Sequence, residues 1–301
     1  MMRTFTIVVA CSLGLGGCGD EDDPPSAQAS TGAAVGSTSS ASPSTGPSTS
    51  GTAQTGSTAA GTTLDEADST GPSGCVAAGG GPVLEDLTLV AADGTSIAAT
   101  VARPAEGSCL PGVLLVHQYL NDRGQWTDVQ TEFVAAGYVA LAIDLRGHGD
   151  SDPQQGELSS LLNDPDQAPQ DVAAGVQWLA ADAGIDDQRL AVVGTSIGAN
   201  LSVVALHQGG VAAAVAVSPR LDPVMALAGM PAMLSLDDLF CIAADNDGGG
   251  DQAASCTQMV AEATGEARLE IIEGSSAHGV AVFDQFPRTT AEIIGWLDDV
   301  L

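Results

Sequence analysis

Residues 190–198 have the sequence LAVVGTSIG, in which a short apolar run leads into a Gly-x-Ser-x-Gly pentapeptide. The apolar run predicts a strand, and the residues after Gly198 predict a helix. A serine on such a tight strand-to-helix turn points its hydroxyl out of the fold, and Gly194 and Gly198 leave room for the backbone to close on itself. Ser196 is therefore the candidate nucleophile. The alternative is a chance match, because the motif is short and the chain is rich in glycine.

The chain around this turn alternates between apolar runs and helical periodicities. The first two runs are expected to form an antiparallel hairpin with its turn at Asp93-Gly94. Strands are expected at residues 84–90, 96–102, 112–117, 138–143, 190–193, 211–217, 239–243 and 269–272, and helices around residues 126–134, 172–179, 201–205 and 293–297. This alternation predicts an α/β fold with a mostly parallel eight-stranded sheet, helices on both faces and ligands bound beyond the carboxyl ends of the strands.

Four further motifs follow predicted strands, namely LLVHQY at 114–119, DLRGHGDS at 144–151, CIAADND at 241–247 and EGSSAHG at 273–279. Together with the pentapeptide, they resemble the α/β-hydrolase family over residues 82–301. One departure is Gln118, which stands where that family usually has a glycine. The resemblance implies an α/β-hydrolase fold and a catalytic triad of Ser196, Asp247 and His278, in the chain order that the family uses.

A serine hydroxyl is a weak nucleophile at neutral pH and needs an imidazole to accept its proton and return it to the leaving group. His278 alone among the four histidines follows the last predicted strand, so it is the candidate base. His207 lies on the helix after Ser196 and is expected at the surface. His117 and His148 lie in turn motifs where the resembled family uses a histidine structurally.

The acid and the oxyanion hole are less sharply defined by the sequence. Asp245, Asp247 and Asp251 crowd one loop, and the spacing from the preceding strand favours Asp247, with Asp245 as the alternative. The resemblance implies that two backbone amides form the oxyanion hole. They are those of Ile197 and of Tyr119, with Gln118 as the alternative to Tyr119.

About twenty residues separate the strand that ends at Val217 from the strand that begins near Leu239. A lid of several helices does not fit there, so we expect little or no lid and an open pocket for a small-molecule or polymer-linked ester. The domain resembles dienelactone-hydrolase-type members, although Ser196 stands where those with that activity have cysteine. We therefore expect a serine hydrolase that cleaves carboxylic esters through an acyl-enzyme. An acyltransferase or peptidase with the same triad and a non-catalytic binding lipoprotein are the alternatives.

Residues 1–17 are predicted to be a signal peptide. Arg3 precedes an apolar stretch, residues 5–15, that is too short to span a bilayer. The sequence Leu15-Gly16-Gly17-Cys18 resembles the lipobox of bacterial lipoproteins, which implies that Cys18 carries a lipid anchor in a membrane of the bacterial cell envelope. Ordinary signal-peptidase cleavage is the alternative. Gly19 favours an outer-membrane or cell-surface destination.

Residues 18–74 are predicted to be a disordered tether, because Ser, Thr, Gly, Ala and Pro dominate them and cannot bury a core. Residues 75–301 have the size of one domain. This domain contains four cysteines, and in an exported chain they are expected to form disulfides. Sequence proximity favours Cys75 with Cys109 and Cys241 with Cys256, among three possible pairings.

The net charge of −30, with eight arginines and no lysine, disfavours nucleic acid as a partner. The acidity mostly indicates a solvated surface. We expect no cofactor and no metal, since the sequence has neither a Cys-x-x-Cys nor a His-x-x-x-His spacing.

Overall fold

The computed structural model describes residues 74–301. The predicted signal peptide, Cys18 and all but the last residue of the predicted tether lie outside the described residues.

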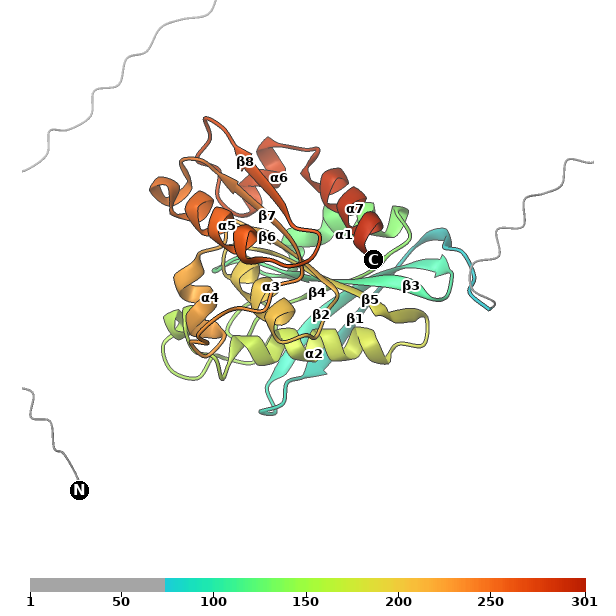
Figure 1. Ribbon diagram of the computed structural model, residues 1–301. Helices are drawn as coiled ribbons and strands as arrows, with labels where there is room; N and C mark the ends of the chain where they lie inside the picture. Colours follow the sequence, from blue (N-terminus) through green and yellow to red (C-terminus); the bar gives the residue numbers. More distant parts are fainter. Residues whose placement is uncertain (1–73) are drawn as a thin grey trace, which may run out of the picture. The chain divides into compact units, whose positions relative to one another are not determined.

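The described part of the chain forms an eight-stranded sheet in the order β1-β2-β4-β3-β5-β6-β7-β8 (Figure 1). β2 is antiparallel to β1 and to β4, and all other neighbours are parallel. The predicted α/β fold and the predicted hairpin are thus confirmed. The strands are β1 Gly79–Val90, β2 Ser96–Glu106, β3 Leu110–Val116, β4 Val139–Ile143, β5 Ile185–Thr195, β6 Ala213–Val217, β7 Asp238–Ala244 and β8 Arg268–Ile272.

Helices cover both faces of the sheet, as Figure 1 shows. α2 (Ala168–Ala181), α3 (Ile197–His207) and α5 (Asp251–Glu262) pack on one face, and α1 (Thr127–Ala135) and α7 (Thr289–Val300) pack on the other. The central strands β3, β4 and β6, and residues 190–193 of β5, are apolar because they contact helices on both sides. In β3, for example, Leu114 and Val116 face the first set of helices, whereas Val113 and Leu115 face the second.

The segment between β6 and β7 contains a single short helix, α4 (Leu221–Leu227), and α6 (Val280–Gln285) follows β8. The helical periodicity of the sequence indicated neither helix. The 3-10 turns η1 (Arg123–Trp126), η2 (Leu158–Leu162) and η3 (Asp247–Gly250) were also not expected. One seven-residue helix in this segment agrees with the expectation of little or no lid.

Two disulfides join the four cysteines of the described residues. Cys75 bonds to Cys109, in the turn between β2 and β3, and Cys241 of β7 bonds to Cys256 of α5. The favoured pairing is confirmed. The second bond closes a loop that includes Asp247.

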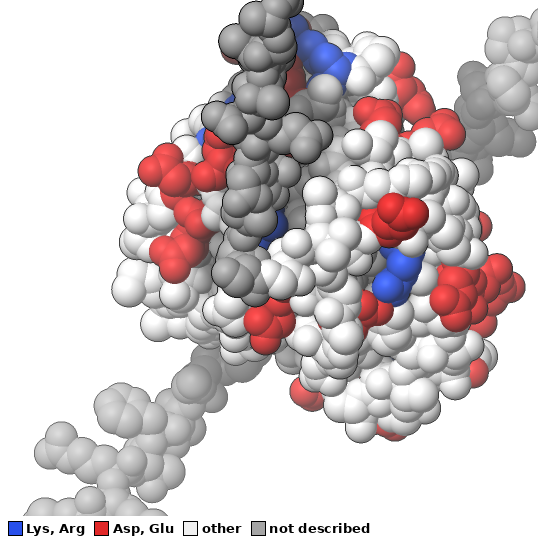
Figure 2. Space-filling view, turned by 90° about the vertical axis from the view of Figure 1, so that its right-hand side faces the viewer, with Lys and Arg blue, Asp and Glu red and all other residues white. Residues whose placement is uncertain are grey.

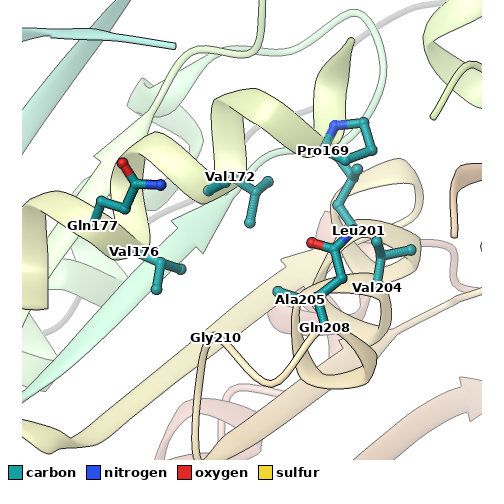
Figure 3. Close-up of a pocket in the computed structure, with 10 residues that line it drawn as sticks. Pro169, Val172, Val176, Gln177, Leu201, Val204, Ala205, Gln208 and Gly210 are labelled. Carbon is teal, nitrogen blue, oxygen red and sulfur yellow. The ribbon is translucent and has the colours of Figure 1, made fainter. Parts of the chain in front are cut away.

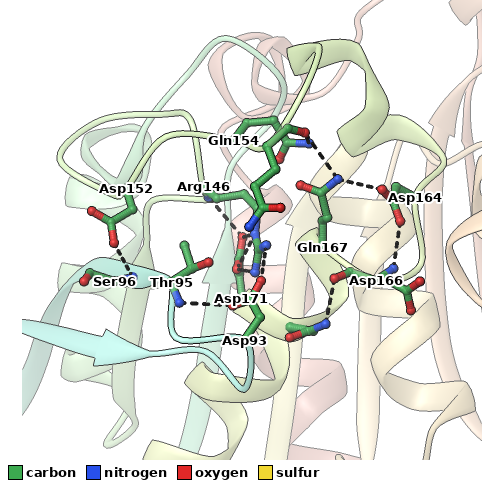
Figure 4. Close-up of polar contacts among 12 residues, drawn as sticks. Asp93, Thr95, Ser96, Arg146, Asp152, Gln154, Asp164, Asp166, Gln167 and Asp171 are labelled. Atoms are coloured by element: carbon green, nitrogen blue, oxygen red, sulfur yellow. Dashed lines mark hydrogen bonds and ion pairs between the residues drawn. The ribbon is translucent and has the colours of Figure 1, made fainter.

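A buried ion pair connects three distant segments (Figure 4). Arg146, which is 1% exposed, bonds through Nη2 to Asp171 of α2 at 2.7 Å and through Nη1 to Asp93 of the β1–β2 turn at 2.6 Å. The bond from Arg146 lowers the pKa of Asp93 to about 2. A buried guanidinium needs such partners, because removing an unpaired charge from water costs several kcal/mol.

Acidic side chains lie in separate patches on the face that Figure 2 draws, with few basic groups among them. Within residues 74–301, no helix combines the length and the apolar character needed to cross a membrane.

Candidate active site

Ser196 lies on the turn between β5 and α3, with a φ of 52° and a ψ of −112°. A non-glycine residue at positive φ is strained, by about 1–3 kcal/mol. Gly194 and Gly198 make the turn possible because neighbouring backbone comes very close to both. A Cβ at Gly194 would lie 2.1 Å from the carbonyl oxygen of Gly198, and one at Gly198 would lie 2.1 Å from that of Val116. The two glycines of the pentapeptide are therefore required by packing.

The structure brings Ser196, His278 and Asp247 together at the carboxyl edge of the sheet. His278 Nε2 lies 2.9 Å from Ser196 Oγ, and His278 Nδ1 lies 2.9 and 3.0 Å from the two carboxylate oxygens of Asp247. A carboxylate can only accept, so Nδ1 carries the proton and Nε2 is free to accept the serine proton. Asp247 is 3% exposed, so its carboxylate is largely removed from water.

The other two acidic residues of the loop lie elsewhere. Asp245 accepts hydrogen bonds from the backbone N–H groups of Gly274 (3.0 Å) and Ser275 (3.1 Å), which lower the pKa of its carboxyl group. Asp251 begins α5 and lies 3.5 Å from Arg220. Among these three carboxylates, only Asp247 contacts His278, and Asp245 instead holds the loop that carries the histidine.

Two backbone amides are candidates for the oxyanion hole, one from the turn after β3 and one from the start of α3. The N–H of Gln118 donates to Gln125 Oε1 at 3.3 Å, and the N–H of Leu120 donates to His148 Nε2 at 3.1 Å. The N–H groups of Tyr119 and Ile197, by contrast, have no acceptor among residues 74–301. These two amides are the ones available to a developing negative charge. Leu120, with a φ of 61°, carries the positive φ of this turn.

The remaining histidines do not contact Ser196. His117 is fully buried, and its Nδ1 donates to the carbonyl of Gln118 while its Nε2 accepts from the N–H of Leu145. Burial lowers the pKa of His117 to about 4, so the ring is neutral near pH 7. His148 Nε2 accepts the hydrogen bond from the N–H of Leu120. His207, the last residue of α3, accepts a hydrogen bond at Nδ1 from the N–H of Ser235.

Several polar contacts around the site were not predicted from the sequence. Gln125 Nε2 donates to Thr195 Oγ1 at 2.8 Å, which ties the oxyanion turn to the residue before the nucleophile. Ser218 Oγ accepts from the N–H of Gly279 at 3.0 Å. Gln118 Oε1 accepts from the N–H of Val280 at 2.8 Å. Only the unusual residue type at position 118 could have drawn attention to one of these contacts.

An apolar cavity of about 180 Å³ lies between α2 and α3 (Figure 3). Val172 and Val176 of α2 line it from one side, and Leu201 and Val204 of α3 line it from the other. None of its lining residues belongs to the group of Ser196, Asp247 and His278, so it is separate from the candidate site.

The sheet order, the strained serine turn and the three hydrogen-bonded side chains define an α/β-hydrolase. Residues 93–267, more than half of the chain, match the family model of peptidase S15, described as X-Pro dipeptidyl-peptidase. The chain belongs to this S15 family and is a serine hydrolase of the α/β-hydrolase type. The matched region includes Ser196 and Asp247 and ends before His278.

Solved structures with the same fold include an acetyl xylan esterase from a Paenibacillus species, with 18% identity and a TM-score of 0.61 over 73% of this chain and 84% of that one. An esterase from Pyrobaculum calidifontis has 19% identity and a TM-score of 0.57, over 73% of this chain and 86% of its own. An uncharacterized Escherichia coli protein from the traX-finO intergenic region is 29% identical over 103 residues. That match covers 34% of this chain and 34% of the relative, so the chain spans about a third of the length of the curated relative.

Proposed function

We propose that the protein cleaves carboxylic esters through an acyl-enzyme formed on Ser196. The observation that carries the proposal is the chain of contacts from Asp247 through His278 to the Ser196 hydroxyl, together with the amides of Tyr119 and Ile197, which have no acceptor within residues 74–301. A base within hydrogen-bond distance of a serine hydroxyl, itself oriented by a buried acid, is the arrangement that nucleophilic acyl transfer requires.

In this mechanism, Ser196 Oγ attacks the ester carbonyl while His278 Nε2 accepts the hydroxyl proton. The carbonyl oxygen becomes an oxyanion that the N–H groups of Tyr119 and Ile197 stabilise. Collapse of the tetrahedral intermediate expels the alcohol, which takes the proton from His278. Water then attacks the acyl-serine with His278 again as the base, and the acid product leaves. Asp247 keeps the proton on Nδ1 of His278 and stabilises the imidazolium that forms when Nε2 accepts the serine proton.

Ester substrates are proposed because, within residues 74–301, the segment between β6 and β7 is too short to form a large lid. The segment between β6 and β7 supplies one seven-residue helix, so small or polymer-linked acyl groups can approach. Acetylated polysaccharides are suitable first polymer-linked substrates, given the fold shared with an acetyl xylan esterase.

Peptide cleavage is the second candidate, and the family description favours it, since S15 is named for X-Pro dipeptidyl-peptidases. Peptidases of the resembled fold usually hold the substrate amine with acidic residues from a cap, whereas the segment between β6 and β7 here has only α4. An X-Pro p-nitroanilide is the substrate that distinguishes the two candidates.

The direct test compares wild type with Ser196→Ala on p-nitrophenyl esters of graded acyl length and on Ala-Pro-p-nitroanilide. Wild type is expected to turn over the short esters, and Ser196→Ala to lower kcat by about 10⁶, as removal of a triad serine does. A fluorophosphonate should label wild type and leave the variant unlabelled. Turnover of the anilide alone would favour the peptidase, and wild-type turnover by Ser196→Ala would exclude the mechanism.

We also propose that Cys18 anchors the domain to a bacterial cell-envelope membrane, in the outer membrane or at the cell surface, ahead of a tether to about residue 74. The lipobox-like sequence before Cys18 supports this. Cys18→Ala removes the residue that would carry the lipid, and stable attachment to a membrane needs two or more acyl chains. The variant should therefore move from the membrane to the soluble fraction. Membrane association of Cys18→Ala after a salt wash would remove the proposal.

A further inference from the structure

Gln118 lies in the oxyanion turn, at a position where the family that the chain resembles usually has a glycine. A glycine there would present only backbone atoms. The glutamine adds a side chain that reaches across the site to the other end of the domain sequence. Its partner is the N–H of Val280, 162 residues away, which donates to Gln118 Oε1 at 2.8 Å.

The loop that carries His278 is shaped to receive this side chain. Gly279 follows the histidine with a φ of 56°, and a Cβ at this position would lie 2.2 Å from Gln118 Oε1. Any larger residue at position 279 would therefore displace the glutamine. The N–H of Gly279 donates to Ser218 Oγ. The two N–H groups after His278 are thus fixed from two directions, by the end of β6 and by the turn after β3.

Hydrogen bonds also fix the backbone of Gln118. Its N–H donates to Gln125 Oε1, and its carbonyl accepts from His117 Nδ1 at 2.7 Å and from the N–H of Asn121 at 3.1 Å. The next residue is Tyr119, whose free N–H we assign to the oxyanion hole. One residue therefore has its backbone in the oxyanion turn and its side chain on the histidine loop.

We propose that Gln118 is a positioning residue that couples the oxyanion amide of Tyr119 to the imidazole of His278. This proposal rests on the proposed function. Acyl transfer needs the base and the oxyanion donors to be correctly positioned around the same substrate carbonyl. A misplacement of about 1 Å can reduce the rate about 100-fold. The contact between Gln118 and Val280 fixes the distance between the two halves of the site.

Two substitutions separate this role from simple packing. Gln118→Met keeps the length of the side chain and removes the acceptor, whereas Gln118→Glu keeps an oxygen that can accept from Val280. Gln118 Nε2 has no acceptor among residues 74–301, so the loss of its N–H groups breaks no described contact. Gln188→Met is the matched control, since Gln188 is exposed and, within residues 74–301, its side chain bonds only to its neighbour Asp187.

The experiment measures kcat and KM on the best short ester, and hydrogen exchange at the amide of Val280. For Gln118→Met we expect kcat to fall about 10- to 100-fold with KM within about threefold of wild type. We also expect the Val280 amide to exchange at least about tenfold faster. Gln118→Glu should retain the protection of Val280 and recover part of kcat, and Gln188→Met should match wild type.

The proposal is overturned if Gln118→Met keeps kcat within about twofold of wild type, or if Gln118→Glu loses as much activity as Gln118→Met with Val280 still protected. Failure of the proposed function has a different signature. In that case wild type neither hydrolyses an ester nor reacts with a fluorophosphonate, while the exchange rate of Val280 still reports whether Gln118 fixes the histidine loop.

Discussion

The charge of Asp247 is the single-residue property on which the proposed mechanism depends most. Asp247→Asn should lower kcat on a short ester by about 10⁴, because an amide favours the wrong tautomer of His278 and offers no charge to the imidazolium. The matched variant is Asp245→Asn, which weakens the hydrogen bonds to Gly274 and Ser275. It should cost less than about tenfold in kcat, with little loss of stability. A larger loss of kcat for Asp245→Asn would reverse the assignment.

His117 is expected to make the stability of the fold pH-dependent. Its folded pKa of about 4 lies below the ordinary value of 6.5, so between these values the unfolded chain binds a proton that the folded chain does not. Stability is therefore at its full value above about pH 6.5 and falls as the pH decreases towards 4, by up to about 1.4 kcal/mol per pH unit from this group.

Urea unfolding of wild type and His117→Gln at pH 7.5, 6.5, 5.5 and 4.5 checks this. The variant should be less stable at pH 7.5, because it disturbs the contacts to Gln118 and Leu145, and should have the shallower pH dependence. Parallel curves for the two proteins would contradict the assignment of this titration to His117.

At the scale of elements, the disulfide between β7 and α5 encloses the loop of the acid. Cys241 and Cys256 are 15 positions apart, and the loop between them includes three glycines at positive φ, Gly248–Gly250. Removing the bond with Cys241→Ala and Cys256→Ala should cost about 3 kcal/mol of stability and should also lower kcat, because Asp247 gains freedom. The pair Cys75→Ala and Cys109→Ala should reduce stability and leave kcat unchanged. Equal kcat for both pairs would contradict a role of this bond at Asp247.

The long central elements were predictable from the sequence, and the short ones were not. Strands such as β3 have continuous apolar runs because helices cover both faces, and α2 and α7 repeat apolar residues at helical spacing. α4 has seven residues with Pro223 inside and α6 has six, which is too few for a periodic pattern. The positions of Ser196, Asp247 and His278 followed from motifs next to strands. The contact of Gln118 with Val280 joins residues 162 apart, and no local pattern reports such a contact.

At the scale of the whole molecule, Arg146 joins the β1–β2 turn, the end of β4 and α2. Arg146→Met would leave Asp171, which is fully buried, without its cation. We expect a loss of about 3–5 kcal/mol in the free energy of unfolding, measured by urea denaturation. Arg288→Met is the control, because the Arg288 side chain is 77% exposed where it pairs with Glu292, and this pair should contribute less than about 0.5 kcal/mol. Similar losses of unfolding free energy for the two variants would contradict the expectation that the burial of Asp171 makes its ion pair the more important one.

The disulfide between Cys75 and Cys109 also fixes the edge of the sheet at which the described domain begins. Cys109 lies just before β3, at the amino edge of the parallel strands, whereas Ser196 follows the carboxyl end of β5. A bead, a surface or a fusion partner joined ahead of Cys75 is thus attached at the edge opposite the serine. Immobilisation through this end should leave the mouth of the site facing the surrounding medium, so that even a bulky polymeric substrate can reach it.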